Sequence, residues 1–152
     1  MSSPATSSEF SQHLLLQYEV PCRMISALAD DFTDEEATRR AGDLKPLVWF
    51  LGHVATTDNY FLTLYAGQES ALSSEYLKRF GRGSDGEADF SDASKGELLE
   101  LLETLRGRVR DVLAALTPED LSRGPEREVM HPLFKTCGSA IALVVAHSAY
   151  HA

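Results

Sequence analysis

The sequence predicts an all-α protein folded as a four-helix bundle. Four long segments space their apolar residues as helices do, and no segment alternates as a strand would. The second and third of these segments are separated by a long polar connection, as one-crossover bundles allow. At 152 residues the chain is long enough to bury one core. We therefore expect one domain over 1–152, with 1–7 disordered.

The first predicted helix covers residues 8–30. Its apolar residues form a stripe along one face, and Ser7 or Ser8 is available to cap its N-terminus. Pro21 lies inside this helix and is expected to kink or interrupt it. A short helical turn capped at Thr33 follows. The next helix begins near Pro46, is apolar almost all round and stops at Gly67, so several neighbours should bury it.

The second half of the chain contains a long loop and two more helices. Residues 68–94 are rich in Ser, Gly and Asp, which predicts the long loop between helices two and three. Residues 95–116 have leucine and valine on one face and charges on the other, which predicts helix three. A further turn begins at Thr117, and the last helix runs from Thr136 to the end of the chain.

Charge and composition exclude several classes of protein. The net charge of -9, with no basic cluster, disfavours binding to nucleic acid. No secretory signal and no apolar run long enough to span a bilayer are evident, so we expect a cytoplasmic protein without a membrane partner. Cys22 and Cys137 lack the spacing of a disulfide framework or a zinc knuckle and are expected to be small buried residues.

The final helix carries the most informative pair of residues. His147 and His151 are four residues apart, which places both imidazoles on one face of the helix, beside apolar residues that should face the core. Two buried imidazoles need polar partners, and one shared cation would satisfy both. Hydrogen-bonded core histidines are the alternative, and the pair alone leaves both open.

A metal site would need a third ligand from another helix. His53 lies on the apolar second helix, and metal sites in helical bundles are built from facing helices. His13 has no spaced partner and is expected on the surface or at the edge of the core. His131, before Pro132, could line the mouth of a site or simply be solvated.

These residues together resemble a known family. The segment 46–54, with its Gly52-His53, followed by a loop, an amphipathic helix and the terminal His147/His151 pair, resembles the DinB-like (DinB/YfiT) superfamily. The resemblance implies an up-down-down-up bundle, often dimeric, with His53, His147 and His151 as ligands of a divalent metal. Members typically continue past the second histidine of the pair with Gly-Gln and further turns, so His151 is expected in a frayed last turn.

The resemblance also implies a class of activity. Relatives include S-transferases and isomerases that use low-molecular-weight thiols. Three neutral imidazoles leave a coordination position open and suit zinc, nickel or iron. The leading hypothesis is a metal-dependent thiol S-transferase or hydrolase acting on a small molecule, as a homodimer. The alternative is a non-catalytic dimerisation or ligand-binding module whose histidines pack in the core.

Overall fold

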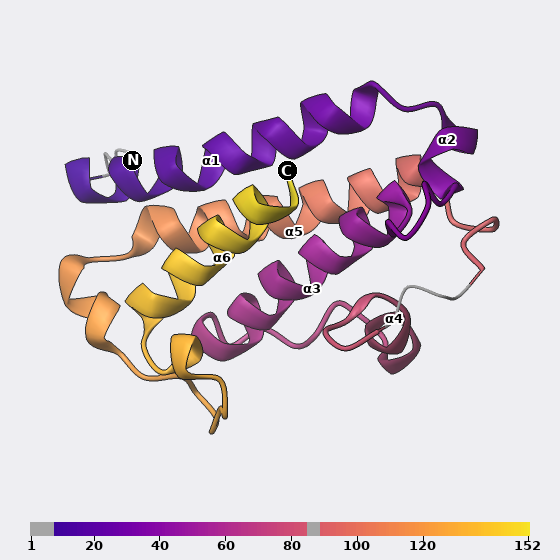
Figure 1. Ribbon diagram of the computed structural model, residues 1–152. Helices are drawn as coiled ribbons and strands as arrows, with labels where there is room; N and C mark the ends of the chain where they lie inside the picture. Colours follow the sequence, from indigo (N-terminus) through magenta and orange to yellow (C-terminus); the bar gives the residue numbers. More distant parts are fainter. Residues whose placement is uncertain (1–7, 85–88) are drawn as a thin grey trace, which may run out of the picture.

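The computed structural model describes residues 8–84 and 89–152, whose regular secondary structure is helical (Figure 1). The α-helices are α1 (Glu9–Asp30), α2 (Asp34–Thr38), α3 (Leu47–Tyr65), α4 (Ser74–Phe80), α5 (Lys95–Ala115) and α6 (Cys137–His151), and the 3-10 turns are η1 (Pro118–Ser122) and η2 (Pro132–Phe134). No β-strand occurs in these two ranges, which confirms the all-α prediction. The predicted disorder of 1–7 lies outside the described residues.

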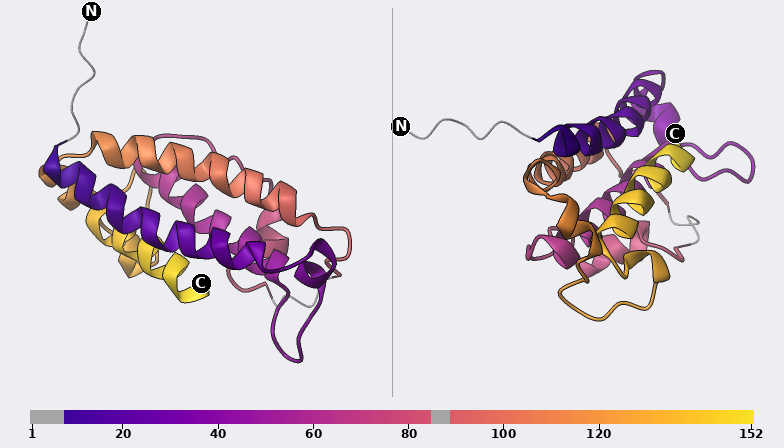
Figure 2. Two further views of the ribbon diagram at one scale, coloured as in Figure 1. Left: turned by 90° about the horizontal axis from the view of Figure 1, so that it is seen from above. Right: turned by 90° about the vertical axis from the view of Figure 1, so that its left-hand side faces the viewer.

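Four long helices enclose the core. α1 packs against α5 and α6, and α3 packs against the same two helices from the opposite side. α1 and α6 run in one direction, whereas α3 and α5 run in the other (Figure 1). A second view shows α1 and α5 lying lengthwise beside one another (Figure 2). As a result, the first half of α3 lies opposite the last turns of α6.

α1 is a single helix that passes through Pro21. Ser8 caps it by accepting a hydrogen bond from the Ser11 backbone N–H. Of the two expected effects of Pro21, a kink or an interruption, the interruption was therefore wrong, although proline removes a backbone hydrogen bond. The physical reason is burial: Tyr18, Pro21 and Cys22 all face the core, and their packing stabilises the helix across the missing bond.

The connection between the two middle helices contains structure that the sequence did not reveal. The segment 68–94, predicted as a loop, includes α4, which Ser73 caps. Phe80 and Phe90 are buried, and α4 packs against α3. Seven residues are too few to establish a helical period in the sequence, so α4 could not be distinguished from a polar loop.

The remaining elements follow the predicted pattern. The short helix capped at Thr33 is α2, which has a complete capping box with Glu36. Thr136 caps α6 in the same way with Ser139. Leu102, Leu105 and Val109 of α5 are almost fully buried, as their spacing predicted. Within the described ranges, every helix is too short or too polar to cross a bilayer.

Candidate metal centre

The structure brings the three predicted histidines together. His53 lies in the second turn of α3, and His147 and His151 lie in the last two turns of α6, which runs antiparallel to α3 (Figure 1). The Nε2 atoms of His53 and His147 are 3.1 Å apart, and those of His147 and His151 are 3.2 Å apart. One ring nitrogen from each lies within 4.8 Å of the other two. Three potential ligand atoms therefore converge on one point.

These separations match the requirements of a metal. Four nitrogen ligands at ~2.05 Å in a tetrahedron are roughly 3.3 Å from one another. His53 is 9% exposed, and the other two histidines are half-buried, so water cannot fully solvate the three rings. Neutral imidazoles that direct lone pairs at one point repel each other, and a divalent cation between them would turn that repulsion into coordination. The donor set fits zinc, nickel or iron.

In His53 and His147, the Nδ1 atom has a hydrogen-bonding partner, so the Nε2 atom is the one that can bind a metal. His53 Nδ1 donates a hydrogen bond to the Phe80 backbone carbonyl at 2.7 Å, which leaves the Nε2 lone pair available. His147 Nδ1 contacts Thr57 Oγ1 at 3.0 Å. Metal-binding histidines typically have such a partner on the second nitrogen, and it orients the ring as well as the tautomer.

The electrostatic environment keeps all three imidazoles neutral at pH 7. Burial lowers the pKa of His53, against the opposing effect of the Phe80 carbonyl. Burial, followed by the repulsion that His151 and His53 exert when they are charged, lowers the pKa of His147 to about 4. Burial and the charges of His53 and Lys45 lower the pKa of His151 to about 4. Neutral imidazole is the form that binds a metal.

Gly52 allows α4 to reach the site. A Cβ atom built on Gly52 would lie 2.3 Å from Phe80 Cδ1, well inside van der Waals contact. The Tyr76 hydroxyl also donates to the Gly52 carbonyl at 3.1 Å. The absence of a side chain at Gly52 therefore lets the Phe80 ring lie against α3, where the carbonyl of the same residue accepts from His53.

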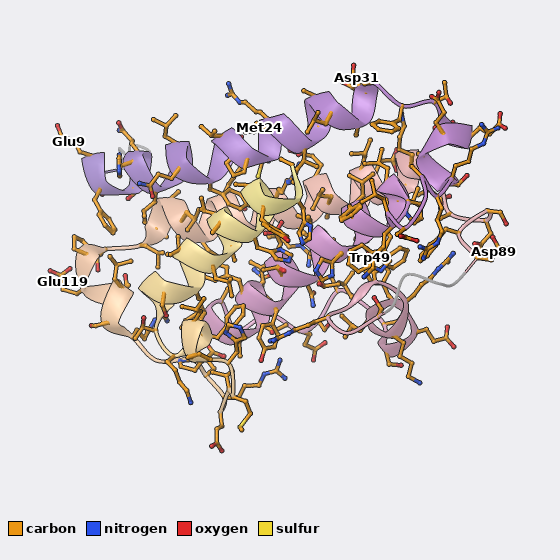
Figure 3. The ribbon with its side chains drawn as sticks, viewed as in Figure 1. Glu9, Met24, Asp31, Trp49, Asp89 and Glu119 are labelled. Atoms are coloured by element: carbon orange, nitrogen blue, oxygen red, sulfur yellow. The ribbon has the colours of Figure 1, made fainter. Side chains whose placement is uncertain are left out.

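Trp49 supports the other face of His53. Its ring, labelled in Figure 3, stacks on the His53 imidazole with centroids 4.5 Å apart and an interplanar angle of 15°. Lys45 Nζ lies 3.7 Å from the Trp49 ring centroid, and Trp49 Nε1 donates to Ser84 Oγ at 3.0 Å. The indole is held on both faces and at its polar edge, so it restricts the orientation of the His53 ring.

An open cavity of ≈ 970 Å³ reaches two of the three histidines. His53, Thr57 and His147 line one part of its wall, and apolar side chains such as Leu77 and Phe134 line another. The volume is of the size that small-molecule sites have. A small molecule in this cavity would contact the histidine cluster directly.

The other two histidines differ in their relation to this cavity. His131 lines it, and its Nδ1 accepts a hydrogen bond from the Leu133 backbone N–H at 3.2 Å. The proton of neutral His131 is therefore on Nε2. His13 is exposed on α1 and bonded to Gln17, away from the cluster, as the sequence suggested.

Sequence reasoning missed the partners of the histidines. Thr57 is four residues after His53, so helical spacing alone could have placed it on the same face. The Phe80 carbonyl gave no signal, because any residue has a carbonyl and only the tertiary fold places this one beside His53. Trp49 lies four residues before His53, so the same helical spacing could have predicted that the two side chains are neighbours.

Comparison with known proteins agrees with the geometry. No curated protein matches the sequence at a significant level. The sequence model of the DinB superfamily matches residues 17–152, a range that includes the three clustered histidines. The chain therefore belongs to the DinB superfamily.

Proposed function

We propose that this protein is a divalent-metal-dependent enzyme whose metal is held by His53, His147 and His151. The observation that carries the proposal is the convergence of three Nε2 atoms beside an open cavity. A structural zinc site normally has four protein ligands, whereas three leave a position for water or substrate. We further propose that the four long helices form the DinB-like up-down-down-up bundle.

We propose a thiol S-transferase or a hydrolase acting on a small molecule, with a low-molecular-weight thiol as one candidate substrate. A divalent metal bound by the three imidazoles would lower the pKa of a coordinated water or thiol, which both reactions need. Asp58 of α3 is buried and bonded to Tyr18, so it is not available as a base in the cavity, whereas Glu128 lines the cavity wall. His131, in the cavity wall, has its Nε2–H free to donate a hydrogen bond to a bound molecule.

Elemental mass spectrometry on tag-free protein tests this proposal. We expect about one zinc, nickel or iron per chain in the wild type, and its loss in His147→Ala. The matched control is His13→Ala, because His13 is exposed and outside the cluster. It should keep the metal.

A second measurement separates the enzyme from the binding-module alternative. The chain has one tryptophan, Trp49, which stacks on His53, so metal binding should change its fluorescence. Added zinc should change the emission of the wild type and of His13→Ala, but not that of His147→Ala. An equal response of all three proteins, or no metal in the wild type together with a destabilised His147→Ala, would favour core histidines without a metal.

We also propose that the protein forms a homodimer through α1. Leu16, Val20, Met24 and Leu28 repeat every four residues on that helix and are 64%, 53%, 48% and 40% exposed. Such a continuous apolar stripe is costly to leave in water and typically packs against another surface. A second copy of α1 would present the same stripe.

A further inference from the structure

A second polar cluster lies in the core, apart from the histidines. Tyr18 of α1, Asp58 of α3 and Arg106 of α5 are 1%, 1% and 2% exposed. Three helices thus each contribute a polar or charged side chain to one buried location. A carboxylate and a guanidinium are seldom buried to this degree unless they are paired.

Only some of the polar atoms in this cluster form a hydrogen bond within the protein. The Tyr18 hydroxyl donates to Asp58 Oδ2 at 3.1 Å, and Arg106 Nη1 donates to Ser26 Oγ at 3.3 Å. Asp58 and Arg106 are close enough to interact electrostatically, but they are not among the ion pairs within 4 Å that the described residues form. The two charged side chains therefore interact through the core without an ion pair within 4 Å.

Three atoms of these two side chains have no partner in the protein. Asp58 Oδ1, Arg106 Nε and Arg106 Nη2 are buried and make no hydrogen bond to another residue. In the part of the chain that the structure describes, no other buried side-chain nitrogen or oxygen is left in this state. Leaving such an atom unsatisfied in the core is destabilising, and more so for a charged group. It is therefore significant that all three belong to one pair of residues.

We propose that a buried water molecule bridges Asp58 Oδ1 and the Nε/Nη2 edge of Arg106. The unsatisfied groups are two donors and one acceptor, and a single water can accept from the donors while donating to the acceptor. An anion would suit Arg106 but would be repelled by Asp58, and a cation would have the opposite conflict. Water is the ligand whose hydrogen bonding complements both side chains.

The protonation state of Asp58 does not remove the need for this partner. Burial raises the pKa of Asp58 to about 7, against the opposing effects of Arg106 and the Tyr18 hydrogen bond. When ionised, Oδ1 needs a donor, and when protonated, the carboxyl needs a further partner for its hydroxyl. In the ionised state the water accepts from both Arg106 donors and donates to Oδ1, and in the protonated state it accepts from the carboxyl hydroxyl and from one Arg106 donor.

The bridge would link α3 and α5 in the centre of the fold, and Tyr18 extends the link to α1. Asp58 directly follows Thr57, whose hydroxyl contacts His147. The water would therefore fix the part of α3 that also supports the histidine cluster. The inference does not depend on a bound metal, because none of its residues belongs to that cluster.

A crystal structure of the full chain grown in bromide tests the inference. The expected result is a density peak without anomalous signal, within hydrogen-bonding distance of Asp58 Oδ1 and of Arg106 Nε or Nη2. A direct Asp58–Arg106 contact with no peak between them would overturn it. An anomalous peak, which identifies a halide, or a peak that touches only one of the two side chains, would also overturn it.

Variants and a solution measurement complete the test. Asp58→Asn keeps a polar group at the bridge and should keep the water, whereas Asp58→Leu should lose it. In ¹⁵N-labelled wild type, the Arg106 Nε–H should show the nuclear Overhauser effect of a long-lived water. The control is Arg110, whose Nε donates to Glu19 and which should show no such effect. If Asp58→Leu does not fold, the wild-type density and the Arg106 signal decide the question.

Discussion

Thr57 and His147 are joined across the α3–α6 interface, with Thr57 Oγ1 3.0 Å from His147 Nδ1. The contact connects the helix that carries His53 to the helix that carries the other two histidines. It also occupies the nitrogen of His147 that faces away from the cluster. The hydroxyl of Thr57 therefore holds the His147 ring in position, and when it accepts from Nδ1–H it leaves Nε2 free for a metal.

Thr57→Val should weaken metal binding while leaving the fold intact. Valine keeps the shape of threonine but removes the hydroxyl, and loss of such a partner typically costs about 10–100-fold in metal affinity. Competition with a chromophoric chelator would measure the change. Thr104→Val is the matched control, because Thr104 lies on the exposed face of α5 and its hydroxyl donates to the Glu100 carbonyl, far from the histidines in sequence. Equal affinities of the two variants would contradict the role given to Thr57.

Gly52→Ala should disturb both stability and metal affinity. The added methyl would meet the Phe80 ring at 2.3 Å, so α4 must shift, at a cost of about 1–3 kcal/mol in the free energy of unfolding. The Phe80 carbonyl would move with it and weaken its bond to His53. Urea unfolding and chelator competition would measure the two effects.

The control for Gly52→Ala is Gly107→Ala on α5. A Cβ atom at Gly107 meets nothing within 4 Å, so alanine should stabilise that helix by roughly 0.5–1 kcal/mol. If Gly52→Ala were also stabilising, the close packing of Phe80 on Gly52 would be wrong.

Asp58 should make stability depend on pH. The pKa of Asp58 is about 7 in the folded protein against 3.8 in the unfolded chain. At any pH between these two values, the folded protein therefore binds more protons than the unfolded chain does. The free energy of unfolding should therefore fall as the pH rises through this window, by at most ~1.4 kcal/mol per pH unit. Asp58→Asn lacks this titration. Subtracting its pH profile from that of the wild type isolates the effect, and a flat difference would contradict the raised pKa.

Val20→Glu should disrupt the proposed dimer. A charge in the centre of the α1 stripe would have to be buried in the interface, and a cost of ~1.4 kcal/mol already weakens association tenfold. Light scattering during size-exclusion chromatography would report the mass. Leu44→Glu is the control, because Leu44 is 65% exposed and lies off α1. A wild type that is monomeric at high concentration would rule out the dimer.

The sequence predicted the features that depend on local spacing. The long helices followed from apolar periodicity and from caps such as Ser8 and Thr136, and the His147/His151 pair followed from its i, i+4 spacing. α4 was missed because seven residues show no clear period. The Phe80 carbonyl beside His53 was not predictable, because it depends on how distant segments pack. For the same reason the sequence left open whether His131 lines a site or is merely solvated, and the structure places it in the cavity wall.

The histidine cluster joins positions that are far apart in the chain. His53 and His147 are separated by 94 residues, and both cysteines are free, so no disulfide connects these regions. A metal held by the cluster would act as a reversible cross-link that closes most of the chain into a loop. Cross-links that close long loops restrict the unfolded state most strongly. The metal supply would then set how much of the protein is folded, as well as whether its site is active.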